Sequence, residues 1–193
     1  NNTFLGAVKL EKREGLQGSE IGEIRNAIAG VLKNIHDHII VNDVMTDAET
    51  GLNSKLYYNL KYSECVRGWK GKGRDFSLMF IRLFRGDLPI GNSEKSGIMK
   101  LLAPVIAKSV GNDSYICRHD DILAVIMPEV NSRKARGLEK QLADILSKYR
   151  IRTGVDAYVQ IDPKIGASST DTAGPGEDPA ALAMELVTAS AGA

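Results

Sequence analysis

The stretch from Ile116 to Glu129 reads ICRHDDILAVIMPE. Two short apolar runs flank a polar segment that contains two adjacent aspartates. Short apolar runs on either side of a compact polar segment are typical of two antiparallel strands joined by a tight turn. The stretch therefore predicts a β-hairpin with a charged tip, and the neighbouring elements have to be arranged around this hairpin.

The elements around the hairpin alternate between strand and helix. The apolar patterns predict a strand over residues 76–84, a helix over 93–110, and the two hairpin strands over 114–117 and 122–127. A helix over 132–149 and a strand pair over 153–169 follow. The order β-α-β-β-α-β is that of ferredoxin-like sheets. The sequence thus predicts an α/β (α+β) fold with a ferredoxin-like core. A helix over 56–69 precedes this core and a short helix over 179–188 follows it.

A long helix is predicted near the beginning of the chain. Ser19 can cap it, and apolar residues follow in steps of three and four at Ile21, Ile24, Ile28, Val31 and Ile35. The same steps continue to His38, Asn42 and Met45, which makes residues 21–45 a heptad seam of the coiled-coil type. The seam fits either an amphipathic helix packed within the chain or a parallel dimerising helix. Gly22 and Gly30 each weaken an isolated helix by about 1 kcal/mol, so the helix needs a partner. We expect a parallel homodimer, because the repeat with its polar position is more than one-sided burial requires.

The composition limits the classes of protein. With 193 residues the chain is long enough for one well-packed core and part of a second domain. Twenty-five basic and 24 acidic residues give a formal net charge of +1, which provides no overall field to attract nucleic acid or an anionic membrane. The longest apolar run, Ile122–Met127, is far too short for a membrane span, and no signal-peptide pattern opens the chain.

The cysteines and the first residues indicate the cellular context. Cys65 and Cys117 lack CxxC spacing, so the sequence predicts free thiols in a reducing compartment, and we expect a cytoplasmic protein. The chain begins without Met on the strand-like run FLGAVKL at residues 4–10. A chain that begins in this way is expected to be a fragment of a longer protein.

Three short motifs resemble those of a known family. DAETGL at Asp47–Leu52 resembles D-x-L-T-G-L, RHDDILAVIMP resembles R-x-G-G-D-E-F-A-V-L-L-P, and KIGASS at Lys164–Ser169 resembles a late S-x-G strand. These are motifs of GGDEF domains, the bacterial diguanylate cyclases. The resemblance covers Asp47 to about Val187. The first strand-like run and the long helix resemble the end of a GAF sensor domain joined to a signalling helix, which implies two parts, residues 1–46 and 47–193.

The resemblance implies a specific chemistry. GGDEF enzymes condense two GTP molecules into cyclic di-GMP across a dimer, with two divalent metal ions held by carboxylates. Alignment on the second hairpin strand places the five residues from His119 to Leu123 on the signature, and a shift by one places Arg118 to Ile122 there. In either alignment both glycines are lost, and larger side chains occupy the space that guanine and ribose need.

Three further positions depart from the family pattern. Arg82 stands where the family has a metal-binding aspartate at the end of the first strand, and an arginine offers no lone pair to a cation. No Lys or Arg follows Lys164, although the family carries a phosphate-binding lysine in its last helix. Asp113 matches the aspartate of the inhibitory R-x-x-D motif, but Val110 replaces its arginine.

These departures predict a degenerate GGDEF domain that has no catalytic residues, binds no metal or cofactor, and acts in bacterial cyclic di-GMP-type signalling through dimerisation or an unknown protein partner. The alternative is a receptor that binds GTP or cyclic di-GMP without turnover. Its candidate binding residues are Arg118, His119, Asp120, Asp121 and Asp113. A third reading is an enzyme with rearranged chemistry. We also expect Arg82 to contact Asp120 or Asp121 in place of a metal ion.

Overall fold

The computed structural model describes the backbone of residues 18–84, 90–153, 158–174 and 176–188, and the side chains in these ranges except those of 18–21 and 34–43. The chain divides into two compact units, residues 1–42 and 43–193. The strand-like run at residues 4–10, on which the expected GAF-like segment depends, lies outside the described residues.

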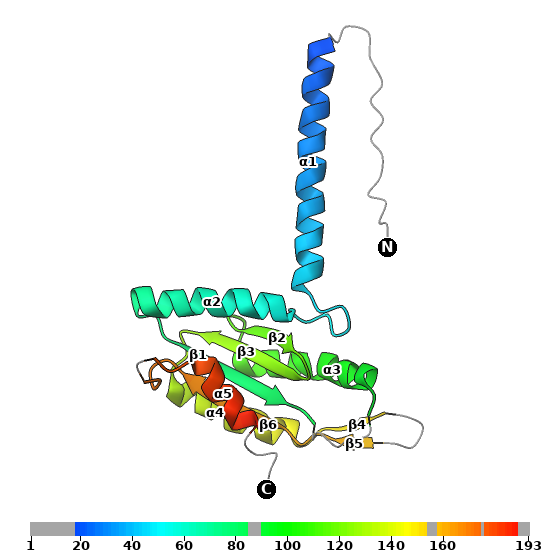
Figure 1. The fold of residues 1–193 in the computed structure, drawn as a ribbon. Helices are drawn as coiled ribbons and strands as arrows, with labels where there is room; N and C mark the ends of the chain where they lie inside the picture. Colours follow the sequence, from blue (N-terminus) through cyan, green and yellow to red (C-terminus); the bar gives the residue numbers. More distant parts are fainter. Residues whose placement is uncertain (1–17, 85–89, 154–157, 175, 189–193) are drawn as a thin grey trace. The chain divides into compact units, whose positions relative to one another are not determined.

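Figure 1 shows the order of the described elements. They are α1 (Gly18–Met45), α2 (Lys55–Lys72), β1 (Phe76–Arg82), α3 (Asn92–Val110), β2 (Tyr115–His119), β3 (Ile122–Pro128), α4 (Ser132–Leu146), β4 (Arg150–Arg152), β5 (Tyr158–Gln160), β6 (Lys164–Ser169) and α5 (Pro179–Thr188). None of these helices, as far as the chain is described, is long and apolar enough to cross a membrane.

The main sheet is antiparallel, with the strand order β2-β3-β1-β6. On β1, Phe80 lies opposite Ala124 of β3 on one side and opposite Gly166 of β6 on the other. The ferredoxin-like arrangement is thereby confirmed. The predicted strand pair over 153–169 is wrong, because β6 pairs with β1, whereas β4 and β5 form a separate two-stranded sheet. A pairing between distant strands leaves no trace in a local apolar pattern.

The sheet carries helices on both faces, as Figure 1 shows. Successive side chains of a strand point to opposite faces, and Phe76 to Ile81 of β1 are all buried. Met79 and Ile81 belong to the core under α3 and α4. Leu78 and Phe80 belong to the core under α2 and α5, as does Cys117. Both faces of the sheet are therefore packed, and polar groups remain accessible mainly at the strand ends.

Helix α2 is framed by two local signals. Ser54 precedes it and accepts a hydrogen bond from the backbone N–H of Tyr57. Gly73 follows it with φ 65°, in the left-handed region that glycine adopts without strain. The helix ends at Lys72, about one turn later than the predicted end at Trp69, because it is Gly73 that supplies the left-handed cap.

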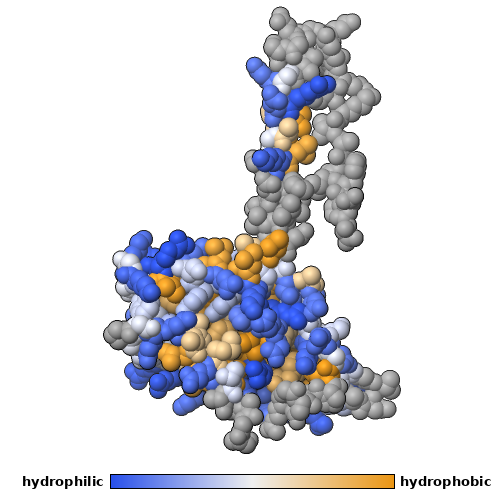
Figure 2. All heavy atoms as spheres, in the orientation of Figure 1, coloured by the Kyte–Doolittle hydropathy of each residue, from blue (hydrophilic) through white to orange (hydrophobic). Residues whose placement is uncertain are grey.

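Helix α1 leaves apolar residues exposed where its side chains are described. Ile24 is 39% exposed, Val31 58% and Leu32 41%. Figure 2 shows such residues gathered along one side of the described part of the helix. Ile24 and Val31 belong to the predicted seam, so no described residue buries this part of the seam.

Candidate functional site

The hairpin tip is a two-residue turn. His119 pairs with Ile122, which leaves Asp120 and Asp121 as the turn. Asp120 has φ 57°, in the left-handed region that aspartate tolerates better than most residues. The charged tip predicted from the sequence is therefore present, and both aspartates are exposed at it.

Arg118 and His119 point to opposite faces because they are neighbours on β2. The His119 ring lies against Tyr58 and Phe80, with ring centroids 5.2 and 5.8 Å away. Burial lowers the pKa of His119, and the Lys55 ammonium lowers it further. His119 therefore belongs to the aromatic core under α2, whereas Arg118 lies on the face that α3 and α4 cover.

The loop of residues 46–54 connects the end of α1 to this site. Asp47 pins the turn, because its Oδ1 accepts hydrogen bonds from Thr50 N at 2.8 Å and from Thr50 Oγ1 at 2.6 Å. Asn53 lies along the exposed edge of β2. Its carbonyl accepts from Arg118 N and its Nδ2 donates to Ile116 O, both at 2.8 Å. The loop thus covers an otherwise unpaired sheet edge.

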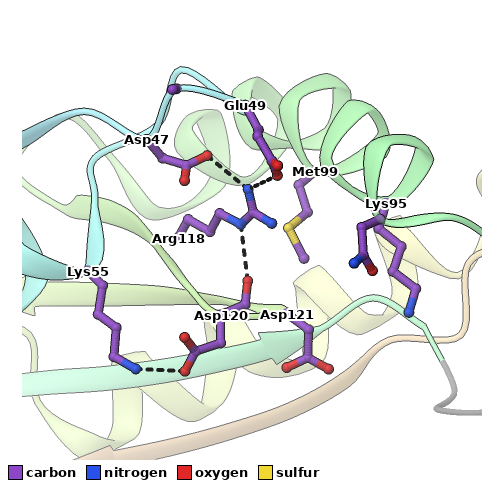
Figure 3. A pocket seen from close by; sticks show the side chains of 10 residues that line it. Asp47, Glu49, Lys55, Lys95, Met99, Arg118, Asp120 and Asp121 are labelled. Carbon is purple, nitrogen blue, oxygen red and sulfur yellow. Dashed lines mark hydrogen bonds and ion pairs between the residues drawn. The ribbon is translucent and has the colours of Figure 1, made fainter. Parts of the chain in front are cut away.

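The Arg118 guanidinium is the centre of an ion-pair cluster (Figure 3). Its Nη1 lies 3.1 Å from Asp47 Oδ1 and 2.5 Å from Glu49 Oε2, and its Nε donates to Asp120 O at 3.1 Å. Glu49 Oε2 also accepts from Ser96 Oγ of α3 at 2.7 Å. One guanidinium therefore joins the loop, the hairpin tip and, through Glu49, helix α3.

The cluster alters the acidity of its members. Hydrogen bonds from Ser96 and Arg118 lower the pKa of Glu49. Burial by itself raises the pKa of Asp47, but hydrogen bonds from Thr50 and Arg118 bring it below its ordinary value. Both carboxylates are therefore held in their charged form around the guanidinium.

Asp120 has a different partner from the one predicted. Lys55, at the start of α2, places its Nζ 2.7 Å from Asp120 Oδ2, and this contact lowers the pKa of Asp120. The expected contact of Arg82 with Asp120 or Asp121 is wrong, since no ion pair joins these three described side chains. The Arg82 Nε is buried without a hydrogen-bond partner among the described residues. Lys55 approaches Asp120 from the first residue of α2.

A cavity of about 520 Å³ opens beside the cluster. Its lining comes from the loop, the hairpin tip and the first turns of α2 and α3, and comprises Asp47, Ala48, Glu49, Lys55, Asn92, Lys95, Met99, Arg118, Asp120 and Asp121. Lys95 makes no ion pair with a described residue, and its side chain lies across the cavity from the hairpin tip (Figure 3). The structure thus brings Arg118, Asp120 and Asp121 together at one cavity.

Glu49, Lys55 and Lys95 were missed from the sequence. Each is a polar residue at a loop or at the start of a helix, where hydropathy has no periodicity to interpret. The spacing Asp47-x-Glu49 was the available signal, because residues two apart in a turn can both reach one cation.

The donor set does not fit the two divalent ions that the family resemblance implies. Asp47 and Glu49 share the Arg118 guanidinium, Asp120 holds the Lys55 ammonium, and Arg82 ends β1. No group of three or more His, Cys, Asp or Glu side chains suited to a metal ion occurs in the part of the chain that the structure describes. Cations of the protein itself already contact Asp47, Glu49 and Asp120.

Asp113 lies apart from the other candidate residues. It precedes β2, whereas the tip follows β2, and it lines a second cavity of about 570 Å³ with Glu129 and Lys134. Val110, at the position of the family arginine, is buried in the core. The five candidate residues therefore do not form one site. Arg118, Asp120 and Asp121 share the first cavity, and Asp113 lines another cavity. His119 packs its ring against Tyr58 and Phe80, with its Nδ1 3.5 Å from Asp120 Oδ2.

Comparisons with known proteins show which solved structures have a similar fold. No protein-family model matches the sequence, and no curated protein does. Similar solved structures include the GGDEF domain of FimX from Pseudomonas aeruginosa, at 17% identity over 76% of this chain and 93% of that chain, with a TM-score of 0.66. The coiled coil and GGDEF domain of DgcB from Caulobacter crescentus in complex with c-di-GMP matches at 17% identity over 89% of this chain and 94% of that chain, with a TM-score of 0.71.

A third similar structure is diguanylate cyclase SiaD in complex with its activator SiaC, from Pseudomonas aeruginosa. It matches at 13% identity over 89% of this chain and 68% of that chain, with a TM-score of 0.65. At these identities the comparisons show the arrangement of helices and strands and do not show the chemistry of the site. The fold of this chain is that of GGDEF domains.

Proposed function

We propose that this chain contains a degenerate GGDEF domain that works without catalysis in bacterial cyclic di-GMP-type signalling. The observation that carries the proposal is the contact of one atom, Arg118 Nη1, with both Asp47 and Glu49. A guanidinium fixed by two carboxylates occupies a wall of the cavity, and a positive side chain there repels a metal ion. Arg82 at the end of β1 adds a second positive charge in place of a metal ligand.

The similar structures support the signalling context. DgcB was solved with c-di-GMP and SiaD with a protein activator. In this proposal the module acts by binding a protein partner or by dimerising, since the fold by itself does not imply turnover. In this proposal residues 1–46 are the end of a GAF-like sensor domain and a signalling helix, and they pass the signal to residues 47–193.

The proposal includes a homodimer through residues 21–45. Support comes from the exposed apolar residues Ile24 and Val31, because a surface helix ordinarily turns such positions toward a partner. The proposed location is the cytoplasm, in keeping with the free thiols of Cys65 and Cys117.

A turnover assay tests the absence of catalysis. The purified chain is incubated with GTP and Mn²⁺ or Mg²⁺, and cyclic di-GMP is measured against a blank without protein. We expect no product above the blank. Product that disappears in the double variant Asp120→Ala, Asp121→Ala would overturn the proposal, whereas product that persists in this variant would identify a contaminating cyclase.

The alternative function is a receptor for GTP or cyclic di-GMP without turnover. The observation that favours it is the cavity of about 520 Å³, a volume typical of small-molecule sites. Lys95 offers this cavity a cation that pairs with no described residue, and such a cation suits a phosphate.

Calorimetric titration with each nucleotide tests the receptor alternative, and two variants locate any binding. Binding that Lys95→Ala weakens belongs to the cavity at the hairpin tip. Binding that Asp113→Ala weakens belongs to the second cavity. Absence of heat with both nucleotides at two temperatures, at concentrations well above those in cells, excludes the receptor.

A further inference from the structure

Helix α2 carries large apolar residues on the face that points away from the sheet. Leu56 and Leu60 lie one turn apart, so they share a face, and they are 49% and 41% exposed. The opposite face of α2 is packed, because Tyr58 is buried and the ring of Tyr62 stacks on it. A helix on a sheet ordinarily turns polar residues to the solvent, so two leucines on the outer face indicate a contact surface.

The apolar part of this outer face is confined to the beginning of α2. Further along the helix the exposed residues are Ser63, Glu64 and Arg67, all of them polar. Helical spacing puts Arg67 on the same side as Leu56 and Leu60. The solvent face of α2 is therefore ordinary in its later turns and apolar only where the helix starts.

The start of α2 adjoins the last residues of α1. Ser54 N donates to Met45 O and Ser54 Oγ donates to Val44 O, both at 2.8 Å. Val44 is itself 49% exposed. Figure 2 shows apolar side chains at the surface over the beginning of α2. Val44, Leu56 and Leu60 thus form one exposed apolar group, which we call the junction patch.

The junction patch lies where the predicted seam of α1 becomes polar. The seam is apolar from Ile21 to Ile35, continues with His38 and Asn42, and ends at Met45. A parallel dimer through this seam has a two-fold axis along it, so the ends of the two α1 helices lie side by side. A surface that adjoins the end of α1 is then brought next to the same surface of the partner.

We propose that the junction patch is a dimer contact and that it packs against the junction patch of a second copy of this chain. The contact provides apolar burial where the seam lacks it. It also joins residues 43–193 to the dimer directly, and not only through α1. The inference rests on the proposed homodimer, to which it adds a contact surface on α2 outside residues 21–45, and it does not depend on the absence of turnover.

Light scattering coupled to size exclusion, over a series of concentrations of the full chain, measures the dissociation constant of the dimer. We expect Leu56→Asp and Leu60→Asp each to raise this constant by about tenfold or more, because each puts a charge into an apolar contact. Both side chains are exposed in one copy, and an acid is favourable near the start of a helix, so both variants should fold. The matched control is Leu101→Asp on α3, where the leucine is 54% exposed; it should leave the constant unchanged.

Cross-linking tests whether the patch meets its own copy. In a two-fold contact the same residue of both copies lies close to the axis. At least one of the variants Leu56→Cys and Leu60→Cys should therefore form a disulfide-linked dimer under mild oxidation. The wild type, which has only Cys65 and Cys117, and Leu101→Cys should remain without a cross-link.

The outcomes separate this inference from the proposed homodimer. A dimer whose dissociation constant neither Leu56→Asp nor Leu60→Asp changes would overturn the inference and leave the homodimer in place, and the patch would then fit a different protein. Absence of a cross-link in both cysteine variants would likewise overturn it. A monomeric wild type would refute both proposals. A dimer that these two aspartates dissociate but Val31→Asp does not would support the patch and refute the seam.

Discussion

Two tyrosines one turn apart on α2, Tyr58 and Tyr62, have hydroxyls in different surroundings. The Tyr58 side chain is buried and its hydroxyl has no hydrogen-bond partner among the described residues. The Tyr62 hydroxyl donates to Asp178, next to the start of α5. Burial raises the pKa of both groups, so both remain neutral at physiological pH. Only the Tyr62 hydroxyl joins two elements.

We predict opposite consequences of removing these hydroxyls. Tyr58→Phe should leave the free energy of unfolding unchanged or raise it, because the hydroxyl lost has no partner. Tyr62→Phe should lower it by about 1 kcal/mol, the usual net value of a hydrogen bond. Urea unfolding of both variants and the wild type measures the difference. A larger loss in Tyr58→Phe than in Tyr62→Phe would contradict the assignment.

His119 predicts a dependence of stability on pH. Its pKa is lowered in the folded state by burial and by Lys55, so below the ordinary value of 6.5 the unfolded chain binds more protons than the folded chain. The free energy of unfolding should therefore fall as the pH falls from 7 to 5. Asp120, the nearby acid, opposes this shift and is already included in its direction.

The variant His119→Phe isolates this contribution. Phenylalanine keeps the aromatic contacts with Tyr58 and Phe80 but cannot bind a proton. Denaturant unfolding at pH 7, 6 and 5 should show a smaller loss of stability in the variant than in the wild type. Parallel pH curves for the two proteins would exclude a role for His119.

At the scale of elements, α5 and β6 pack unusually closely. A Cβ on Gly166 of β6 would lie 2.4 Å from Ala183 O and 2.7 Å from Leu186 Cβ. The first neighbour is a backbone atom that moves only with the helix. Glycine at this position therefore sets the distance between α5 and the sheet.

We predict that Gly166→Ala lowers the free energy of unfolding by about 1–3 kcal/mol, the cost of overpacking. The matched control is Gly97→Ala on the exposed face of α3, where an added Cβ meets no atom within 4 Å. This control should raise stability by up to about 1 kcal/mol, because alanine favours the helix. Thermal or urea unfolding distinguishes the two, and equal effects would refute the close packing.

At the scale of the whole molecule, the proposed dimer predicts that dimer formation depends on one exposed apolar residue, on α1, and not on another, on α3. Val31 lies on the predicted seam of α1 and is 58% exposed, and Leu101 on α3 is 54% exposed. Val31→Asp puts a charge into the dimer interface and should yield a monomer. Leu101→Asp should leave the dimer intact.

Light scattering coupled to size exclusion measures the mass of both variants and of the wild type. A wild-type chain that remains monomeric at micromolar concentrations would favour a helix packed within the chain. Dissociation of both variants alike would place the contact elsewhere than on the seam.

The sequence alone determined the fold class and nearly all of the elements. Alternating and helical apolar patterns are local, so β1, the hairpin, α3 and α5 could be located to within a few residues. The order of these elements led to the ferredoxin-like sheet. The short motifs around Asp47 and the hairpin pointed to the GGDEF fold, which the solved structures support.

Only the tertiary structure decided which charges meet. Arg118 and Asp47 are 71 residues apart, and Lys55 and Asp120 are 65 apart. The sequence prediction paired Asp120 or Asp121 with Arg82 instead. The physical reason is that an exposed charged side chain carries no periodic signal, and its partner depends on how the loop after α1 and the start of α2 lie against the hairpin. Apolar burial fixes the sheet from local patterns, whereas ion pairs follow from the topology that this burial creates.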